Sequence, residues 1–149
     1  MKHQSRRSPF TTLAAALLLA LLATAARAEM RQYGSFEVHY SVFSSSFLQP
    51  DVAAAYGIVR AKDRALINIA VRHGTRDAAT VTAVLSGTRG DLIHKTPLEF
   101  REIREEQAVY YIAEFDFVSG ETQYFDIAIL PAGEARPLVL QFNHALYAD

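Results

Sequence analysis

The sequence contains no cysteine. A chain without cysteine has no catalytic thiol, no thiolate metal site and no disulfide, so its stability must come from burial of side chains. It also lacks the H-x-H and HExxH patterns of local metal sites, the G-x-S-x-G turn of serine hydrolases and a phosphate-binding glycine loop. These absences exclude the commonest local signatures of metal, nucleophilic and nucleotide chemistry.

The chain has only one long apolar run, and it lies at the N-terminus. Lys2, Arg6 and Arg7 precede an Ala- and Leu-rich stretch over 13–26, which the small-residue pattern Ala26-Arg27-Ala28 closes. This arrangement predicts a secretory signal peptide over residues 1–28, with cleavage between Ala28 and Glu29. The alternative is a retained transmembrane helix, but the run falls short of the ~20 residues that a span needs. We therefore expect no membrane span after processing, and a single domain over residues 29–149.

The expected mature domain has no excess of basic residues. Four of the 15 Lys and Arg residues lie in the signal segment, which leaves 11 against 16 Asp and Glu and a net charge of −5. Because nucleic acid is bound by neutralising phosphates, this acidic balance argues against a nucleic-acid partner. A domain of this length can bury a sizeable core without disulfides.

Short apolar–polar alternation recurs through the mature chain and predicts β-strands. The predicted strands cover 36–42, 58–61, 65–72, 80–86, 92–93, 98–104, 108–117, 124–129 and 138–142. Their spacing predicts an all-β, immunoglobulin-like antiparallel sandwich of seven to nine strands, with a closed barrel as the alternative.

The stretch 43–60, FSSSFLQPDVAAAYGIVR, interrupts this strand pattern. Pro50 suits the first turn of a helix and Gly57 suits its end, so one short helix is predicted after the first strand. Phe47, Leu48 and Tyr56 are apolar side chains outside the strand pattern. We expect them either to cap one end of the sandwich or to form a binding surface.

Two long segments carry a family resemblance. VHYSVFSSSFLQPDVAAAYGIVRAKDRALINIAV, over 38–71, and YFDIAILPAGEARPLVLQFNHALY, over 124–147, resemble the family of domain of unknown function 4426. The resemblance covers nearly all of the mature chain. It implies an exported protein of Gram-negative bacteria with an immunoglobulin-like fold, and it brings no catalytic residues.

Four groups of polar residues are candidates for sites. His39, His73, His94 and His144 do not share one strand face, so we expect structural roles for them and no metal or other cofactor. The carboxylates between 99 and 126 occupy outward positions and favour a solvated face. The basic residues Arg60, Lys62, Arg64, Arg72 and Arg76 cluster in the sequence. Ordinary solubilising charge is the favoured interpretation, and steering of a partner or an anionic ligand is the alternative. Ser44, Ser45 and Ser46 are expected to cap or turn the chain.

The pattern as a whole favours an exported, non-enzymatic binding or interaction module of the periplasm. Its expected partner is an envelope protein that contacts Phe47, Leu48 and Tyr56. The alternative is a small-ligand binder or an enzyme with a cleft near the 43–60 insertion.

Overall fold

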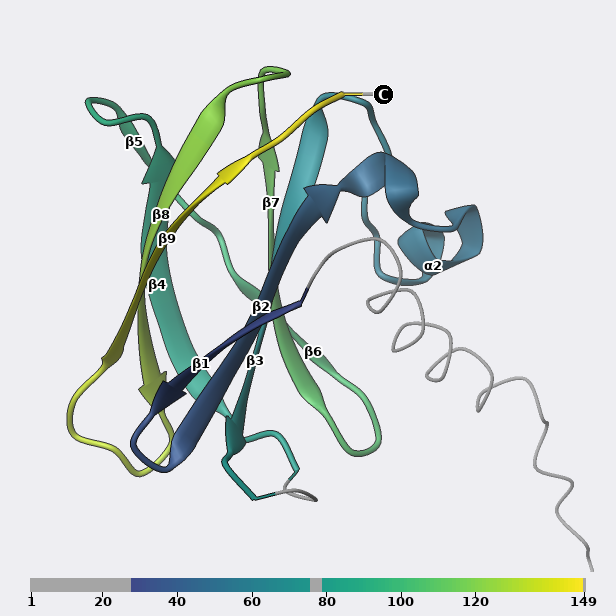
Figure 1. The fold of residues 1–149 in the computed structure, drawn as a ribbon. Helices are drawn as coiled ribbons and strands as arrows, with labels where there is room; N and C mark the ends of the chain where they lie inside the picture. Colours follow the sequence, from purple (N-terminus) through teal and green to yellow (C-terminus); the bar gives the residue numbers. More distant parts are fainter. Residues whose placement is uncertain (1–27, 76–78, 149) are drawn as a thin grey trace, which may run out of the picture.

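The computed structural model describes residues 28–75 and 79–148, and these form nine strands in two antiparallel sheets packed as a sandwich (Figure 1). The five-stranded sheet has the order β1 (Glu29–Tyr33), β2 (Phe36–Ser44), β3 (Arg64–His73), β7 (Val109–Asp116), β6 (Arg101–Arg104). The four-stranded sheet has the order β5 (Lys95–Pro97), β4 (Ala83–Gly90), β8 (Thr122–Pro131), β9 (Leu138–Ala145). The predicted sandwich fold is confirmed.

The main core lies between the two sheets and follows the predicted alternation. Val38 and Ile67 from one sheet, and Ile127 and Leu140 from the other, are all below 1% exposed. Full burial of such a side chain contributes about 1.5–3 kcal/mol, which is how a chain without disulfides obtains its stability. None of the helices in the described part of the chain is long and apolar enough to cross a membrane.

Two predicted strands do not form, and the strand at the N-terminal edge was not predicted. Residues 58–61 form a loop, and residues 92–93 lie in the turn between β4 and β5. β1 was not predicted, although it pairs along its whole length with β2 through the turn at Gly34. β1 is an exposed edge strand with four exposed residues, so it lacks the apolar alternation on which the prediction relied.

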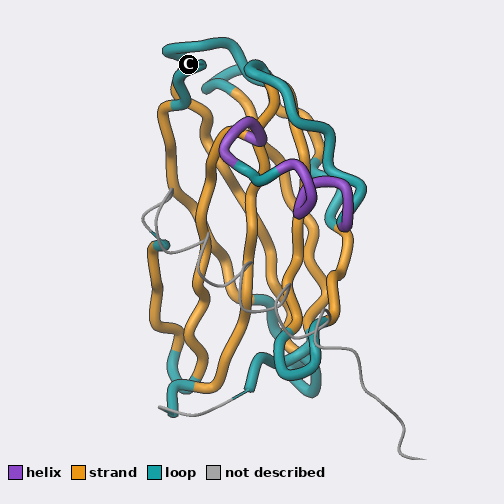
Figure 2. The backbone as a smooth tube through the Cα atoms, turned by 90° about the vertical axis from the view of Figure 1, so that its right-hand side faces the viewer, coloured by secondary structure: helices purple, strands orange, loops and turns teal. Residues whose placement is uncertain are grey.

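The 43–60 insertion lies on the outer face of the five-stranded sheet, where the 3₁₀ turn η1 (Ser45–Phe47) and the helix α2 (Pro50–Ala55) cross in front of the strands (Figure 2). The expectation that it caps one end of the sandwich is therefore wrong. Phe43 and Leu66 are directly paired and, with Ile112, point away from the main core. They form a second apolar patch that needs a cover. We call it the outer cluster: Phe43, Leu48, Val52, Ala53, Ile58, Leu66 and Ile112.

The serines hold the insertion in place, as the sequence predicted. Ser44 is the N-cap of η1 and its Oγ accepts a hydrogen bond from the Ser46 N–H at 3.3 Å. Ser45 is fully buried and its Oγ accepts from the Ala61 N–H at 3.0 Å. These bonds satisfy polar groups beneath the insertion and hold its start next to Ala61, which directly follows its end.

Candidate functional site

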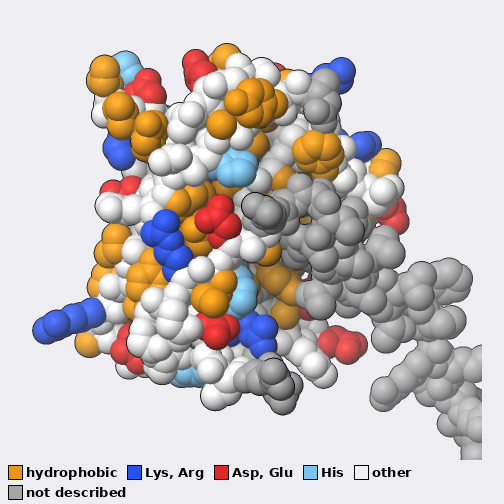
Figure 3. Space-filling view, viewed as in Figure 1, with side chains coloured by type: hydrophobic (Ala, Val, Ile, Leu, Met, Phe, Trp, Pro, Cys, Tyr) orange, Lys and Arg blue, Asp and Glu red, His pale blue; other side chains and the backbone are white. Residues whose placement is uncertain are grey.

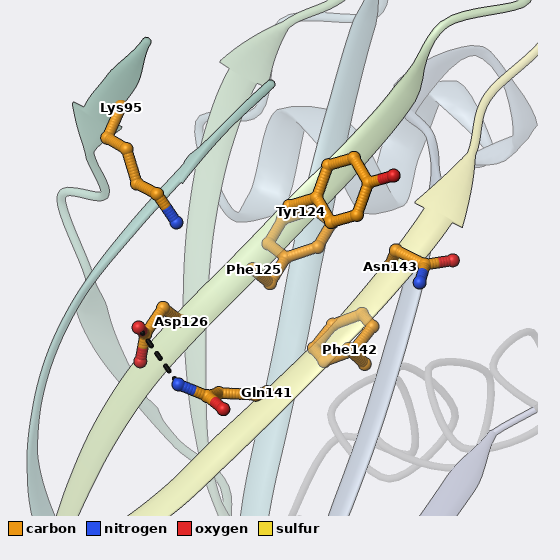
Figure 4. Close-up of a pocket in the computed structure, with 7 residues that line it drawn as sticks. All are labelled: Lys95, Tyr124, Phe125, Asp126, Gln141, Phe142 and Asn143. Atoms are coloured by element: carbon orange, nitrogen blue, oxygen red, sulfur yellow. Dashed lines mark hydrogen bonds between the residues drawn. The ribbon is translucent and has the colours of Figure 1, made fainter. Parts of the chain in front are cut away.

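An open hollow of about 310 Å³ lies on the four-stranded sheet (Figure 4). Seven described residues line it: Lys95, Tyr124, Phe125, Asp126, Gln141, Phe142 and Asn143. Strand register brings them together, because Tyr124 pairs with Asn143 and Asp126 pairs with Gln141 across β8 and β9. Phe125 and Phe142 point to the opposite side, where their rings stack at 4.7 Å and help to form the core.

Lys95 reaches this hollow from β5 because the residue between it and β8 is a glycine. Gly90 pairs with Lys95 on one side and with Tyr124 on the other. A Cβ atom at Gly90 would lie 1.9 Å from the carbonyl oxygen of His94, so no other residue fits this backbone. The sheet therefore has a gap in its layer of outward side chains, and Lys95 extends along it.

The polar groups of the hollow are mostly free to bind a ligand. Gln141 donates from Nε2 to Asp126 Oδ2 at 3.1 Å, which leaves the other carboxylate oxygen open. Within the described part of the chain, Lys95 Nζ, the Tyr124 hydroxyl and the Asn143 amide make no side-chain hydrogen bond or ion pair. One ammonium, one carboxylate, two amides and an aromatic ring thus face the same open space.

The three residues predicted to bind a partner have different environments. Leu48 is 5% exposed and belongs to the outer cluster, whereas Phe47 is 45% exposed. Tyr56 is half-buried; its hydroxyl donates to Glu105, and its carbonyl accepts from Arg101 Nη1 at 2.7 Å. Burial and the bond to Glu105 raise the pKa of Tyr56 to about 12. Phe47 is therefore the one of the three with a largely exposed apolar side chain.

The histidines are dispersed over the fold. His39 bonds Glu37 at 3.1 Å on the outer face of β2, His73 stacks on Phe36, and His94 bonds Asp91 in the β4–β5 turn. Burial lowers the pKa of His144, although Glu29 opposes this effect. Among the described residues, no group of three or more His, Cys, Asp or Glu side chains is placed to hold a metal ion.

The charged groups singled out in the sequence do not converge either. Arg60, Lys62 and Arg64 lie around the start of β3 and Arg72 near its end, so about 26 Å of extended strand separates Arg64 from Arg72. Arg76 lies outside the described residues. Glu114 and Asp116 form ion pairs with Arg101 and Arg64 at 3.0 and 3.2 Å. Figure 3 shows charges of both signs interspersed with hydrophobic side chains on the face seen in Figure 1.

The hollow was missed because its residues come from three strands. The carboxylates up to Asp126 were assigned outward positions, but the sequence did not show which residues lie beside Asp126. The available signal was the pair of polar residues Gln141 and Asn143 on alternate positions of the last strand. Only the register of β8 against β9 places them opposite Asp126 and Tyr124.

The comparisons with known proteins identify both a family and a fold. The family model described as "Domain of unknown function (DUF4426)" matches residues 30–149. A crystal structure of a DUF4426 family protein from Pseudomonas aeruginosa PAO1 is 37% identical with a TM-score of 0.71, covering 82% of this chain and 96% of that one. A search of the curated proteins finds no match to this chain.

Two structures of FetP from uropathogenic Escherichia coli strain F11 resemble this fold, each at 10% identity. The copper-bound FetP variant has a TM-score of 0.56 and covers 80% of this chain and 95% of its own. FetP as isolated after recombinant expression in the periplasm has a TM-score of 0.58, with 83% and 96% covered. At this identity the likeness supports a shared fold alone.

Proposed function

Because this chain belongs to the family described as domain of unknown function 4426, which assigns no activity, we propose from its surface that it is an exported, non-enzymatic binding module. Its binding site is the hollow on the four-stranded sheet. The observation that supports this is the convergence of Lys95, Asp126 and Asn143 on one open space beside the ring of Tyr124. The lining residues include no histidine, serine or threonine, and their groups are suited to hold a ligand by hydrogen bonds and charge.

The fold is compatible with export and removal of the leader. β1 begins at Glu29, so cleavage after Ala28 leaves every strand whole. N-terminal sequencing of the protein recovered from the periplasm is expected to start at Glu29. A protein that keeps its first 28 residues and sediments with the membrane would contradict this part of the proposal.

The binding site is tested by ligand-observed and protein-observed NMR with the low-molecular-weight fraction of a periplasmic extract. We expect a component that shifts the resonances of Tyr124 and Asn143 and that no longer binds after Tyr124→Ala. Tyr147→Ala is the matched control, because Tyr147 is 66% exposed and does not line the hollow. Equal loss of binding in both variants would refute the hollow as the site. So would resonance shifts that are confined to residues on other surfaces.

A second candidate function is contact with an envelope protein through the insertion. Phe47 and Val59 are 45% and 53% exposed, and Arg60 Nη2 donates to the Ser46 carbonyl at 3.0 Å, which holds their loops together. A photocrosslinking residue at position 47 is expected to capture one periplasmic protein. The same probe at Val84, which is 71% exposed at the start of β4, is the control. Identical products from both positions would exclude a specific contact.

The copper of the FetP variant is not part of this proposal. The likeness to that structure is 10% in sequence and supports no shared ligands. Two histidine–carboxylate pairs lie close together among the described residues, His39 Nε2 with Glu37 Oε2 at 3.1 Å and His94 Nδ1 with Asp91 Oδ2 at 3.2 Å, and both are accounted for as hydrogen bonds.

A further inference from the structure

We infer that the hollow binds a zwitterion, namely an amino acid or short peptide with a free ammonium and a free carboxylate. This inference rests on the proposed function of the hollow as a binding site. It concerns the chemical class of the ligand, and it follows from how the two charged side chains are placed.

Lys95 and Asp126 reach the hollow from different strands of the four-stranded sheet. Two rows of paired residues cross the sheet: Lys95, Gly90, Tyr124 and Asn143 form one row, and Pro97, Thr88, Asp126 and Gln141 form the next. Lys95 and Asp126 are thus two strands apart and belong to neighbouring rows on the same face. At about 4.8 Å per strand and about 3.3 Å per residue, their backbones are roughly 12 Å apart.

The two charges do not neutralise each other. Lys95 and Asp126 form no ion pair within 4.0 Å, and in the described part of the chain neither meets another opposite charge at that distance. In Figure 4 the Lys95 side chain extends over the sheet toward the side where Asp126 and Tyr124 lie. A ligand between them meets a cation on one side and an anion on the other. This field favours a ligand whose own charges are opposite and separated.

The amides next to Asp126 match the backbone of a peptide, because Gln141 and Asn143 lie on β9, the strand beyond β8. Gln141 and Asn143 each carry an amide that can both donate to a peptide carbonyl and accept from a peptide N–H. The half-buried ring of Tyr124 offers an apolar wall for a side chain. A neutral saccharide would use the amides and the ring but would leave both charges unmatched, and an anion would be repelled by Asp126.

The test is an NMR titration of the protein purified from the periplasm with alanyl-alanine. Three further probes are N-acetyl-alanyl-alanine, which lacks the ammonium, alanyl-alanine amide, which lacks the carboxylate, and N-acetylglucosamine. We expect alanyl-alanine to shift Tyr124 and Asn143 in a saturable manner, and each blocked peptide to bind about five- to tenfold more weakly. Binding of alanyl-alanine should weaken as salt is raised, because both contacts are open to solvent.

Two variants test which side chain binds the carboxylate of the ligand and which binds its ammonium. Lys95→Gln should abolish the difference between alanyl-alanine and its amide, and Asp126→Asn should abolish the difference between alanyl-alanine and its acetylated form. Lys62→Gln, at an exposed lysine outside the hollow, should change neither ratio. Blocked peptides that bind as well as alanyl-alanine, or a preference for N-acetylglucosamine, would overturn the inference while leaving the hollow a binding site. If none of the probes shifts the resonances of the hollow, the inference is overturned. If the periplasmic extract also contains no component that binds the hollow, the proposed function is refuted too.

Discussion

Arg31 on β1 donates a hydrogen bond from Nη1 to the backbone carbonyl of Gln141 on β9 at 2.7 Å. The two strands are edges of different sheets and lie side by side on the face toward the viewer in Figure 1. Tyr33 repeats the contact with a bond from its hydroxyl to the Val139 carbonyl at 2.8 Å. Side chains of one edge thus satisfy carbonyls of the other, which closes this side of the sandwich and protects an edge strand from pairing with another chain.

Removing both contacts should open this edge. Arg31→Met with Tyr33→Phe is expected to lower the free energy of unfolding by roughly 1–2 kcal/mol, because two hydrogen bonds are lost at an exposed site. Urea denaturation measures the change, and light scattering should show increased association through β9. Arg136→Met with Tyr147→Phe is the matched control at exposed positions. A double variant no less stable than this control would show that the contacts do not close the edge.

Within the insertion, the buried Leu48 should matter more for stability than the exposed Phe47. Leu48→Ala is expected to lower the free energy of unfolding by about 2–4 kcal/mol, since Leu48 is 5% exposed in the outer cluster. Phe47→Ala, at a side chain 45% exposed, should cost less than about 1 kcal/mol. Thermal unfolding of both variants checks the difference. Equal costs would mean that Phe47 is as important for folding as Leu48 and would weaken its assignment to a partner contact.

Gly90 should be intolerant of any side chain. Gly90→Ala places a Cβ 1.9 Å from the His94 carbonyl oxygen, so we expect a loss of about 2–3 kcal/mol or a shift of the β4–β5 turn. Gly133→Ala is the control: its φ is +85° but nothing lies within 4 Å of the added atom, so strain alone should cost about 1 kcal/mol. Chemical denaturation compares the two. Similar costs would show that the backbone near His94 yields easily and that Gly90 does not define the hollow.

His144 should make the protein less stable in mild acid. Burial lowers its pKa below the ordinary value of 6.5, so the folded state resists protonation and the unfolded state accepts it. The stability that the neutral ring contributes is complete above pH 6.5 and is lost as the pH falls through the lowered pKa. His144→Gln should flatten the change in unfolding free energy between pH 7.5 and pH 5. His94→Gln, at an exposed ring, should not, and an unchanged slope in the first variant would contradict this assignment.

Alternation within a strand was a sufficient guide to the main core. Alternation over the predicted strand 108–117 puts Val109, Tyr111, Ala113 and Phe115 on one face, and all four pack in the core or against it. This works because the period of two is a local property of an extended backbone. The same reasoning failed at 58–61, where Ile58 is buried by the outer cluster and has no partner strand in the described structure. Propensity alone does not show what a short apolar run will pack against.

Arg89 is a charged residue whose inward position the sequence pattern does not show. It lies on the inner face of β4, with its guanidinium 5.2 Å from the Phe115 ring and a bond from Nη1 to Gln123 Oε1 at 3.2 Å. Nothing in its neighbours along the chain marks it as inward-facing. Its side chain crosses apolar surface to reach the amide of Gln123, which is itself buried, and this contact forms only in the folded sandwich.

The sequence by itself determined the class of fold, the absence of thiol chemistry, the inward face of most strands and the family resemblance. Each of these depends on residue identity or on contacts a few positions apart. The tertiary structure alone decided that the insertion covers the outer face of a sheet and that Lys95, Tyr124, Asp126 and Asn143 surround one hollow. Those arrangements are set by register between strands that are distant in sequence, and a shift of one residue would turn each side chain to the other face.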